Sequence, residues 1–192
     1  MKILLVRFSS LGDVVLVSAA LEGLAGQGVG AEVHVLTKPA FRDVFLNNPK
    51  VGRVLEWCPE DGLFSLARQI RAAKYDGIVD LHGNLRSRLL RVLVPRSRWT
   101  VYPKGALRRR LAMALGRPGL LPADHVVDRY ARALQPVGTT GETCTPQLFP
   151  TPDDHAFASD ALRTGGWDGL QPVLAFAPGA RWATKSWPAE YW

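Results

Sequence analysis

The chain has 192 residues and a formal net charge of +7; 47% of its residues are hydrophobic, 21% are charged and only 2 are cysteines. This is the composition of a globular protein, and the length suffices for one full core with part of a second domain but excludes two complete large domains. The widely separated cysteines exclude a disulfide framework and favour a reducing cytoplasm, and no stretch reaches the roughly 18 apolar residues of a membrane span or carries an export signal.

Short apolar runs alternate with longer amphipathic stretches from the first residues onward. Lys2–Phe8 predicts a strand, Ser9–Asp13 a tight loop and Val14–Ala25 a helix, after which Ala31–Thr37 predicts a second strand. We expect further strands over Val51–Trp57, Gly77–Leu81 and Trp99–Tyr102, and further helices over Pro39–Asn47, Leu63–Lys74, Leu85–Leu93, Leu107–Leu115 and Ala123–Gln135. Repeated βα units predict an α/β fold of the Rossmann-like kind, a parallel sheet with helices on both faces.

Residues 137–152 interrupt this alternation with three Pro, two Gly and five Thr in sixteen residues. We interpret them as a linker between an N-terminal domain, residues 1–136, and a second α/β domain that begins at residue 153. The second domain opens with a predicted helix, Asp153–Arg163, and a predicted strand, Val173–Ala177. A loop, Pro178–Pro188, follows, and the sequence then ends at Trp192 before such a domain could be complete.

Asp13 follows the first predicted strand, at the edge of a parallel sheet where ligands bind. A carboxylate there can act as a base. It can equally be a helix cap, because acids are favoured at the start of a helix, and the pattern leaves the two roles evenly balanced.

Polar residues also follow the predicted strand Gly77–Leu81, in the stretch Asp80–Arg88. We favour a loop that faces a ligand, because packing alone does not require so many polar groups at the end of a buried strand. The alternative is that Asp80 and Asn84 satisfy backbone groups while the arginines form a solvated helix face. His34 and His125 have no metal-ligand spacing, so we treat both as structural and predict no metal site.

The segment from Leu81 to Ala123 contains ten Lys or Arg residues and no acid, so it carries +10 while the rest of the chain carries −3. Three arginines, Arg108–Arg110, lie at the start of a predicted helix, where a bound anion such as phosphate or carboxylate would offset their unfavourable interaction with the helix dipole. A nucleic-acid surface has similar charge, but no nucleic-acid-binding motif accompanies it. Both common glycine-rich nucleotide fingerprints are absent, whereas Lys185 lies in a loop that could hold phosphate.

Three stretches in this order resemble those of the lipopolysaccharide heptosyltransferases, glycosyltransferase family 9: KILLVRFSSLGD at residues 2–13, YDGIVDLHGNLRSR at residues 75–88 and PGARWATKSWP at residues 178–188. The resemblance implies that the chain is the N-terminal half of a GT-B fold. A complete GT-B fold has two Rossmann-like domains, of which the N-terminal one binds the acceptor and the C-terminal one mainly binds the nucleotide sugar. It also implies that heptose is transferred with inversion from the substrate ADP-heptose to the lipid A inner-core oligosaccharide. This reaction takes place at the cytoplasmic face of the inner membrane and uses neither a cofactor nor a metal.

The same resemblance implies roles for individual residues. Asp13 matches the catalytic carboxylate, which takes the proton of the attacking hydroxyl. Donor-phosphate binding falls to Thr184, Lys185 and Ser186. We expect acceptor binding by Ser10, Gly12, His82, Asn84, Arg86, Arg108, Arg109 and Arg110.

Because the donor domain is incomplete, we expect no turnover by this polypeptide alone. A non-catalytic module that binds an anionic saccharide is the first alternative. A polyanion or nucleic-acid binder is the second, and it should show a steep dependence of affinity on salt.

Overall fold

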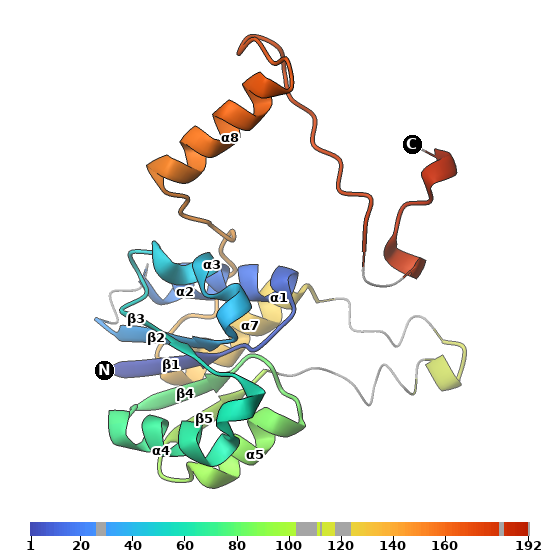
Figure 1. The fold of residues 1–192 in the computed structure, drawn as a ribbon. Coiled ribbons are helices and arrows are strands. Elements are labelled where there is room, and N and C mark those ends of the chain that lie inside the picture. Colours follow the sequence, from blue (N-terminus) through green and yellow to red (C-terminus); the bar gives the residue numbers. More distant parts are fainter. Residues whose placement is uncertain (26–29, 103–110, 112, 118–123, 181–182, 192) are drawn as a thin grey trace. The chain divides into compact units, whose positions relative to one another are not determined.

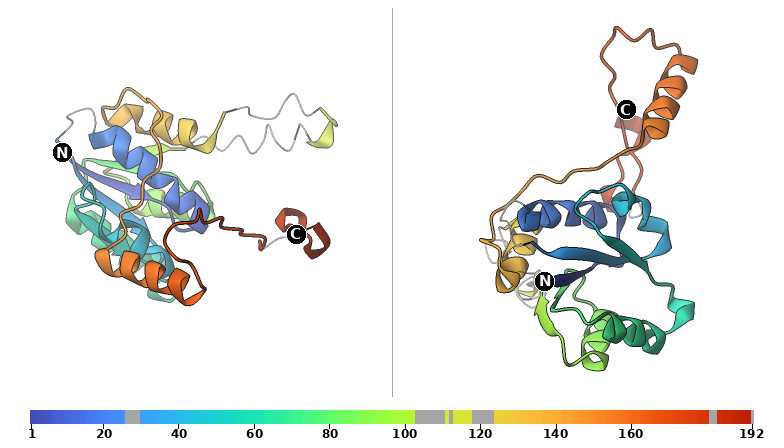
Figure 2. Two further views of the ribbon diagram at one scale, coloured as in Figure 1. Left: turned by 90° about the horizontal axis from the view of Figure 1, so that it is seen from above. Right: turned by 90° about the vertical axis from the view of Figure 1, so that its left-hand side faces the viewer.

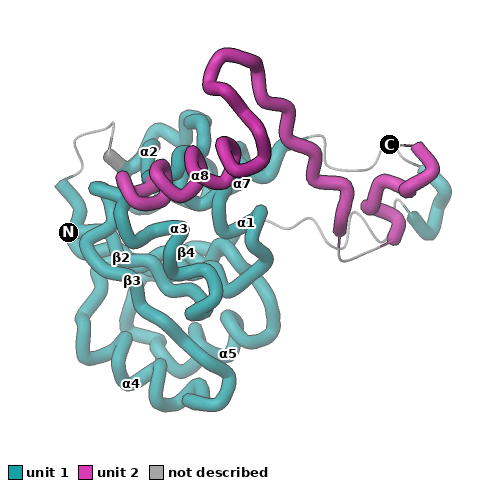
Figure 3. The backbone as a smooth tube through the Cα atoms, turned by 45° about the horizontal axis from the view of Figure 1, so that its top comes forward, with its two compact units in different colours: residues 1–149 teal, residues 150–192 magenta. Residues whose placement is uncertain are grey.

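The computed structural model describes residues 1–25, 30–102, 111, 113–117, 124–180 and 183–191. It divides the chain into two compact units, Met1–Phe149 and Pro150–Trp192, which Figure 3 shows in different colours.

Unit 1 is built on a sheet of five parallel strands in the order β3-β2-β1-β4-β5. The strands are β1 (Lys2–Val6), β2 (Glu32–Thr37), β3 (Arg53–Glu56), β4 (Gly77–Asp80) and β5 (Arg98–Val101). In the register of the sheet Leu5 lies between Val35 of β2 and Val79 of β4. The chain therefore adds β2 and β3 on one side of β1 and then crosses to add β4 and β5 on the other side.

Helices cover both faces of this sheet (Figures 1 and 2). One face is covered by α1 (Leu11–Val15), α2 (Val17–Ala25), α3 (Asp43–Leu46) and α7 (Val126–Leu134), and the other by α4 (Leu63–Ala73) and α5 (Leu85–Leu93). Short 3-10 turns complete the unit: η1 (Pro39–Phe41), η2 (Pro59–Asp61) and η4 (Gln135–Val137).

Two apolar cores result, because successive side chains of a strand point to opposite faces. Ile3 and Leu5 pack beneath α2 and α7, whereas Leu4 and Val6 pack beneath α4 and α5. All four are fully buried, and each such side chain favours the folded state by roughly 1.5–3 kcal/mol relative to an exposed one. The run KILLV is apolar on both faces because both faces are covered.

The predicted Rossmann-like α/β fold is confirmed, with shifts of a few residues at the ends of several elements. The helix expected over Pro39–Asn47 is wrong as a single element, because this stretch forms the 3-10 turn η1 followed by the short helix α3. The helix expected from Val14 already begins at Leu11, because Ser10 adopts extended backbone at the N-cap position, and α1 and α2 are separated at Leu16. The helix expected over Ala123–Gln135 is α7, which begins after His125; the His125 side chain accepts a hydrogen bond from the backbone N–H of Val127. Of the helix expected over Leu107–Leu115, residues 107–110 and 112 lie outside the described residues.

Most of the segment expected to be a linker, residues 137–149, belongs to unit 1. The backbone N–H of Gln147 donates to Ser18 Oγ on α2 at 2.9 Å, and the hydroxyl of Thr143 donates to Asp128 Oδ1 on α7 at 2.7 Å. Polar side chains of two helices thus hold a segment whose own composition favours no regular structure.

Unit 2 begins with α8 (Pro152–Thr164), which a capping box between Thr151 and Asp154 starts. The strand expected over Val173–Ala177 is wrong: residues 172–180 have no regular secondary structure. A strand needs a hydrogen-bonded neighbour, and the described part of unit 2 contains no second strand. Two 3-10 turns, η5 (Ala183–Lys185) and η6 (Ala189–Tyr191), follow. Among the described residues of the whole chain, no helix combines the length and apolar character needed to cross a bilayer.

Candidate functional site

The loops that follow β1 and β4 lie beside each other at the carboxyl edge of the sheet. The pairing of the two strands continues past their ends, because the backbone N–H of Leu81 donates to the carbonyl oxygen of Val6 at 3.1 Å. The strand order reverses at β1, and open α/β sheets bind ligands in the crevice at this position.

Arg7 links the two loops. It is buried directly after β1, where its Nη1 donates to the carbonyl oxygen of Leu81 at 2.6 Å and its Nη2 forms an ion pair with Asp13 Oδ2. A buried guanidinium is costly unless it is paired and hydrogen-bonded, so these contacts fix both the arginine and the Asp13 carboxylate. Arg7 was not predicted as a site residue, although a cation at the end of an apolar strand is a signal that could have identified it.

Asp13 is the third residue of α1, after the N-cap residue Ser10 and two helical positions. Its Oδ2 also accepts a hydrogen bond from Ser10 Oγ at 3.1 Å, and its side chain remains 36% exposed. No side chain forms a capping hydrogen bond at the start of α1. The carboxylate therefore contacts Arg7 and a hydroxyl rather than backbone N–H groups, and no described group donates to its Oδ1.

Asp80, at the end of β4, has a different environment. It is almost fully buried, and its Oδ1 accepts the backbone N–H groups of His82 at 2.9 Å and Gly83 at 2.7 Å. Asn84 follows as the N-cap of α5, where it exchanges hydrogen bonds with Ser87 in a capping box. Both polar side chains thus satisfy backbone groups, which was the alternative to a loop that faces a ligand.

His82 brings the two loops into contact through their side chains. Its ring lies edge-on to the ring of Phe8, with 5.3 Å between the ring centroids, and it is 9% exposed. These two adjoining loops and the helix starts that follow them consequently contain five of the predicted site residues: Ser10, Gly12, Asp13, His82 and Asn84.

Tyr130 of α7 lies beneath this edge and was not predicted as a site residue. The Arg7 guanidinium lies 6.0 Å from the centre of its ring, and Tyr102 packs against it with a centroid distance of 5.1 Å. Burial raises the pKa of the Tyr130 phenol above its usual value. Its hydroxyl finds no hydrogen-bond partner among the described residues. The period of α7 predicts that Tyr130 is buried but not what it packs against.

The remaining candidates belong to α5, to unit 2 or to residues that are not described. Arg86 is exposed on α5, and Arg108, Arg109 and Arg110 lie outside the described residues. Thr184 and Lys185 are exposed in unit 2, on a loop that closes on itself: Ser186 Oγ contacts the backbone N–H and carbonyl of Ala180 at 3.2 Å each. The backbone N–H of Trp187 completes the closure by donating to the carbonyl of Pro178 at 2.9 Å.

A family model for glycosyltransferase family 9 (heptosyltransferase) matches residues 63–192, more than half of the chain. The chain belongs to glycosyltransferase family 9. It is 26% identical to the lipopolysaccharide heptosyltransferase 1 of Pseudomonas aeruginosa over 213 aligned residues, which cover 100% of this chain and 56% of that relative. The chain thus spans about half the length of this curated relative.

Solved structures of the family confirm the fold. A family 9 glycosyl transferase from Veillonella parvula superposes with a TM-score of 0.76 at 20% identity, over 98% of this chain and 56% of that one. The ADP-heptose lps heptosyltransferase II of Escherichia coli gives a TM-score of 0.68 at 20% identity, over 98% of this chain and 58% of that one. The chain therefore matches about half of a GT-B heptosyltransferase, as the resemblance implied.

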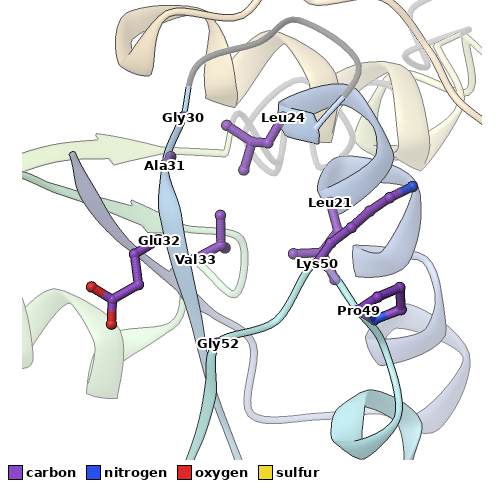
Figure 4. Close-up of a pocket in the computed structure, with 9 residues that line it drawn as sticks. All are labelled: Leu21, Leu24, Gly30, Ala31, Glu32, Val33, Pro49, Lys50 and Gly52. Atoms are coloured by element: carbon purple, nitrogen blue, oxygen red, sulfur yellow. The ribbon is translucent and has the colours of Figure 1, made fainter.

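A cavity of about 540 Å³ lies at the opposite, amino edge of the family 9 sheet (Figure 4). Its lining includes Leu21, Leu24, Val33 and two charged residues, Glu32 and Lys50. Both charges are already paired, Lys50 with Glu22 and Glu32 with His34 and Lys2, so the cavity offers no unsatisfied charge to a ligand. No cluster of potential metal ligands occurs within the described ranges.

Proposed function

We propose that this chain is the acceptor-binding half, with the beginning of the donor half, of a heptosyltransferase of lipopolysaccharide core synthesis. The whole enzyme transfers heptose from ADP-heptose to a sugar of the lipid A inner core, with inversion and without a metal or cofactor, at the cytoplasmic face of the inner membrane. Family membership supports the class of reaction, and its similarity to lipopolysaccharide heptosyltransferases supports the substrates. Another Escherichia coli heptosyltransferase structure holds an ADP-2-deoxy-2-fluoro heptose.

The observation that carries the proposal is the position of the Asp13 carboxylate at the strand-order reversal. Oδ2 is fixed by Arg7 and Ser10, Oδ1 accepts no hydrogen bond from a described group, and the side chain is partly exposed. In the reaction Oδ1 takes the proton of the acceptor hydroxyl as that oxygen bonds to the anomeric carbon of heptose. The bond from this carbon to the diphosphate breaks on the opposite side, and ADP leaves with the electron pair. A single displacement of this kind inverts the anomeric centre.

Arg7 positions this base. Its two contacts, one to each loop, hold the carboxylate in place against the end of β4. Preorganised geometry of this kind lowers the barrier because the reacting groups need not be aligned during the reaction.

The other groups bind the two substrates. Lys185, with Thr184 and Ser186, is suited to the donor diphosphate, since an ammonium stabilises the charge that builds up on the leaving group. His82, Asn84, Arg86 and Arg108–Arg110 are proposed to bind the acceptor, together with Ser10 and Gly12. The carboxylates and phosphates of an inner-core saccharide are the anions that arginine recognises best.

The test is Asp13→Asn in a protein that carries a complete donor domain. Asparagine keeps the size and one acceptor oxygen but cannot take a proton, so turnover should fall about 10²- to 10⁴-fold while acceptor binding is retained. The matched control is Asp43→Asn, which changes a first-turn acid of α3 and should leave turnover near the wild-type level. Turnover of Asp13→Asn within a few-fold of wild type would overturn the assignment of the base.

A further inference from the structure

The outer face of α5 is apolar where a surface helix is normally polar. Leu85, Leu89 and Val92 lie at positions i, i+4 and i+7 and are 72%, 46% and 72% exposed. The side of α5 that packs on the sheet is formed by a different set, which includes Ser87 and Leu90. Single exposed apolar residues are ordinary. Three that recur at helical spacing form an apolar stripe exposed to solvent, in addition to the side of α5 that packs on the sheet.

Cations flank this stripe on both sides. Arg86, Arg88 and Arg91 are all exposed on α5, and Arg68 and Arg71 are exposed on the neighbouring α4. Neither helix contains an acid. Every ion pair found among the described residues lies outside these two helices. On the other face α1, α2 and α3 contain three acids and no cation, and the two arginines of α7, Arg129 and Arg132, are accompanied by Asp128.

The same layer has a basic hollow at its far end, where α4 and α5 finish. Arg71, Lys74 and Arg96 line a cavity of about 420 Å³ together with Tyr75 and Val94. Three cations around one concavity extend the positive field of α5 along the whole layer.

We infer that the outer face of the α4–α5 layer docks on the surface of a bilayer rich in anionic lipids. Leu85, Leu89 and Val92 enter the boundary between headgroups and acyl chains, and the arginines contact headgroup phosphates. A bilayer supplies both kinds of contact at once, whereas a nucleic-acid backbone supplies the charge but no apolar complement to the stripe. The purpose of this surface rests on the proposed function: α5 begins at the loop of His82 and Asn84, so docking there brings the site to a lipid-linked acceptor.

The experiment measures sedimentation of the whole chain with vesicles of phosphatidylglycerol and phosphatidylcholine, and with vesicles of phosphatidylcholine alone. We expect binding to the mixed vesicles that weakens as salt rises, and little binding to the neutral ones. Leu85→Gln/Leu89→Gln/Val92→Gln should lower the vesicle affinity at least tenfold. Arg88→Gln/Arg91→Gln should lower it by about fivefold for each charge removed.

Two matched controls lie on the opposite face of unit 1, and a third lies in unit 2. Leu46 of α3 is 45% exposed, so Leu46→Gln is the counterpart of Leu89→Gln, the single change that stands in if the triple variant fails to fold. Arg42→Gln/Arg132→Gln removes the same two charges as the arginine variant. Phe157→Ser changes an exposed side chain of unit 2. All three controls should bind the mixed vesicles as the wild type does.

Several results would overturn the inference: equal losses in the α5 variants and their controls, equal binding to neutral vesicles, or loss of binding in Phe157→Ser. Vesicle binding needs no turnover, so Asp13→Asn should sediment like the wild type. A failure of docking with a normal result for Asp13→Asn would reject the surface alone. Normal docking with unchanged turnover in Asp13→Asn would reject the base alone.

Discussion

Asp13 in the first turn of α1 and Asp80 at the end of β4 lie at the same edge of the sheet, yet the two carboxylates have different surroundings. Asp80 is almost fully buried and accepts hydrogen bonds from two backbone N–H groups, so its carboxylate stabilises the loop that follows β4. Asp13 is partly exposed, and its contacts from Arg7 and Ser10 both reach one oxygen. A carboxylate that satisfies backbone groups shapes a loop, whereas a partly exposed one that side chains hold through a single oxygen can react through the other. The difference depends on hydrogen-bond partners and exposure, not on residue type or place in the sequence.

The largest effect on stability is expected for Asp80→Ala. The change removes the acceptor of two N–H groups, and hydrogen bonds to a charged group contribute about 1.5–3 kcal/mol each, so the free energy of unfolding should fall by about 3 kcal/mol or more. Asp80→Asn retains one acceptor oxygen and should lose about half as much. Urea denaturation followed by the circular dichroism of unit 1 measures both. A larger loss for Asp13→Ala than for Asp80→Ala would reverse the comparison.

Arg7→Met should have an intermediate effect, because it leaves the carbonyl of Leu81 without its donor and Asp13 without its cation. We expect a loss of about 2 kcal/mol in the free energy of unfolding, within the range for a buried group left unsatisfied. In a protein with a complete donor domain, kcat should fall while the KM for the acceptor changes little. Arg7→Lys can serve only one of the two contacts and should lie between wild type and Arg7→Met. If kcat is unchanged in Arg7→Met, the arginine is structural only.

The smallest effect is expected for Asn84→Ala, which removes the N-cap of α5. Loss of such a cap costs about 1 kcal/mol. Asn84→Asp caps as well as asparagine and serves as the control. Calorimetry on both variants then measures the affinity for an anionic inner-core saccharide. If the affinity falls only in Asn84→Ala, where stability is lost, Asn84 stabilises the loop alone. Affinity that drops in Asn84→Asp, where stability is kept, assigns it to the acceptor as well.

Much of unit 1 follows from patterns in the sequence. The alternation of apolar runs with amphipathic stretches predicts the parallel strands and the helices that cover them, because each pattern reports which faces of an element are buried. The place of Asp13 follows as well, since a loop after the first strand of a parallel sheet lies at its carboxyl edge.

Other features depend on contacts between distant residues, which a local pattern does not contain. Arg7 reads as the end of an apolar strand until its contact with Leu81, 74 residues away in the sequence, is known. The contact of Tyr130 with Arg7 joins residues even farther apart in the sequence. The run Val173–Ala177 has the composition of a strand, but a strand forms only where a neighbour accepts its hydrogen bonds. The family resemblance, not the composition, supplied the substrates.

The place of β1 in the middle of the sheet also affects how the chain folds. Lys2–Val6 pairs with Glu32–Leu36 on one side and with residues up to Asp80 on the other. Contacts between residues so far apart in the sequence form slowly, because a long loop must close before they stabilise anything. During synthesis β1 therefore emerges well before its second neighbour, and Ile3, Leu4 and Leu5 stay incompletely covered until residue 80 has left the ribosome. This interval, rather than the finished fold, is when the molecule is most open to aggregation or to the binding of a chaperone.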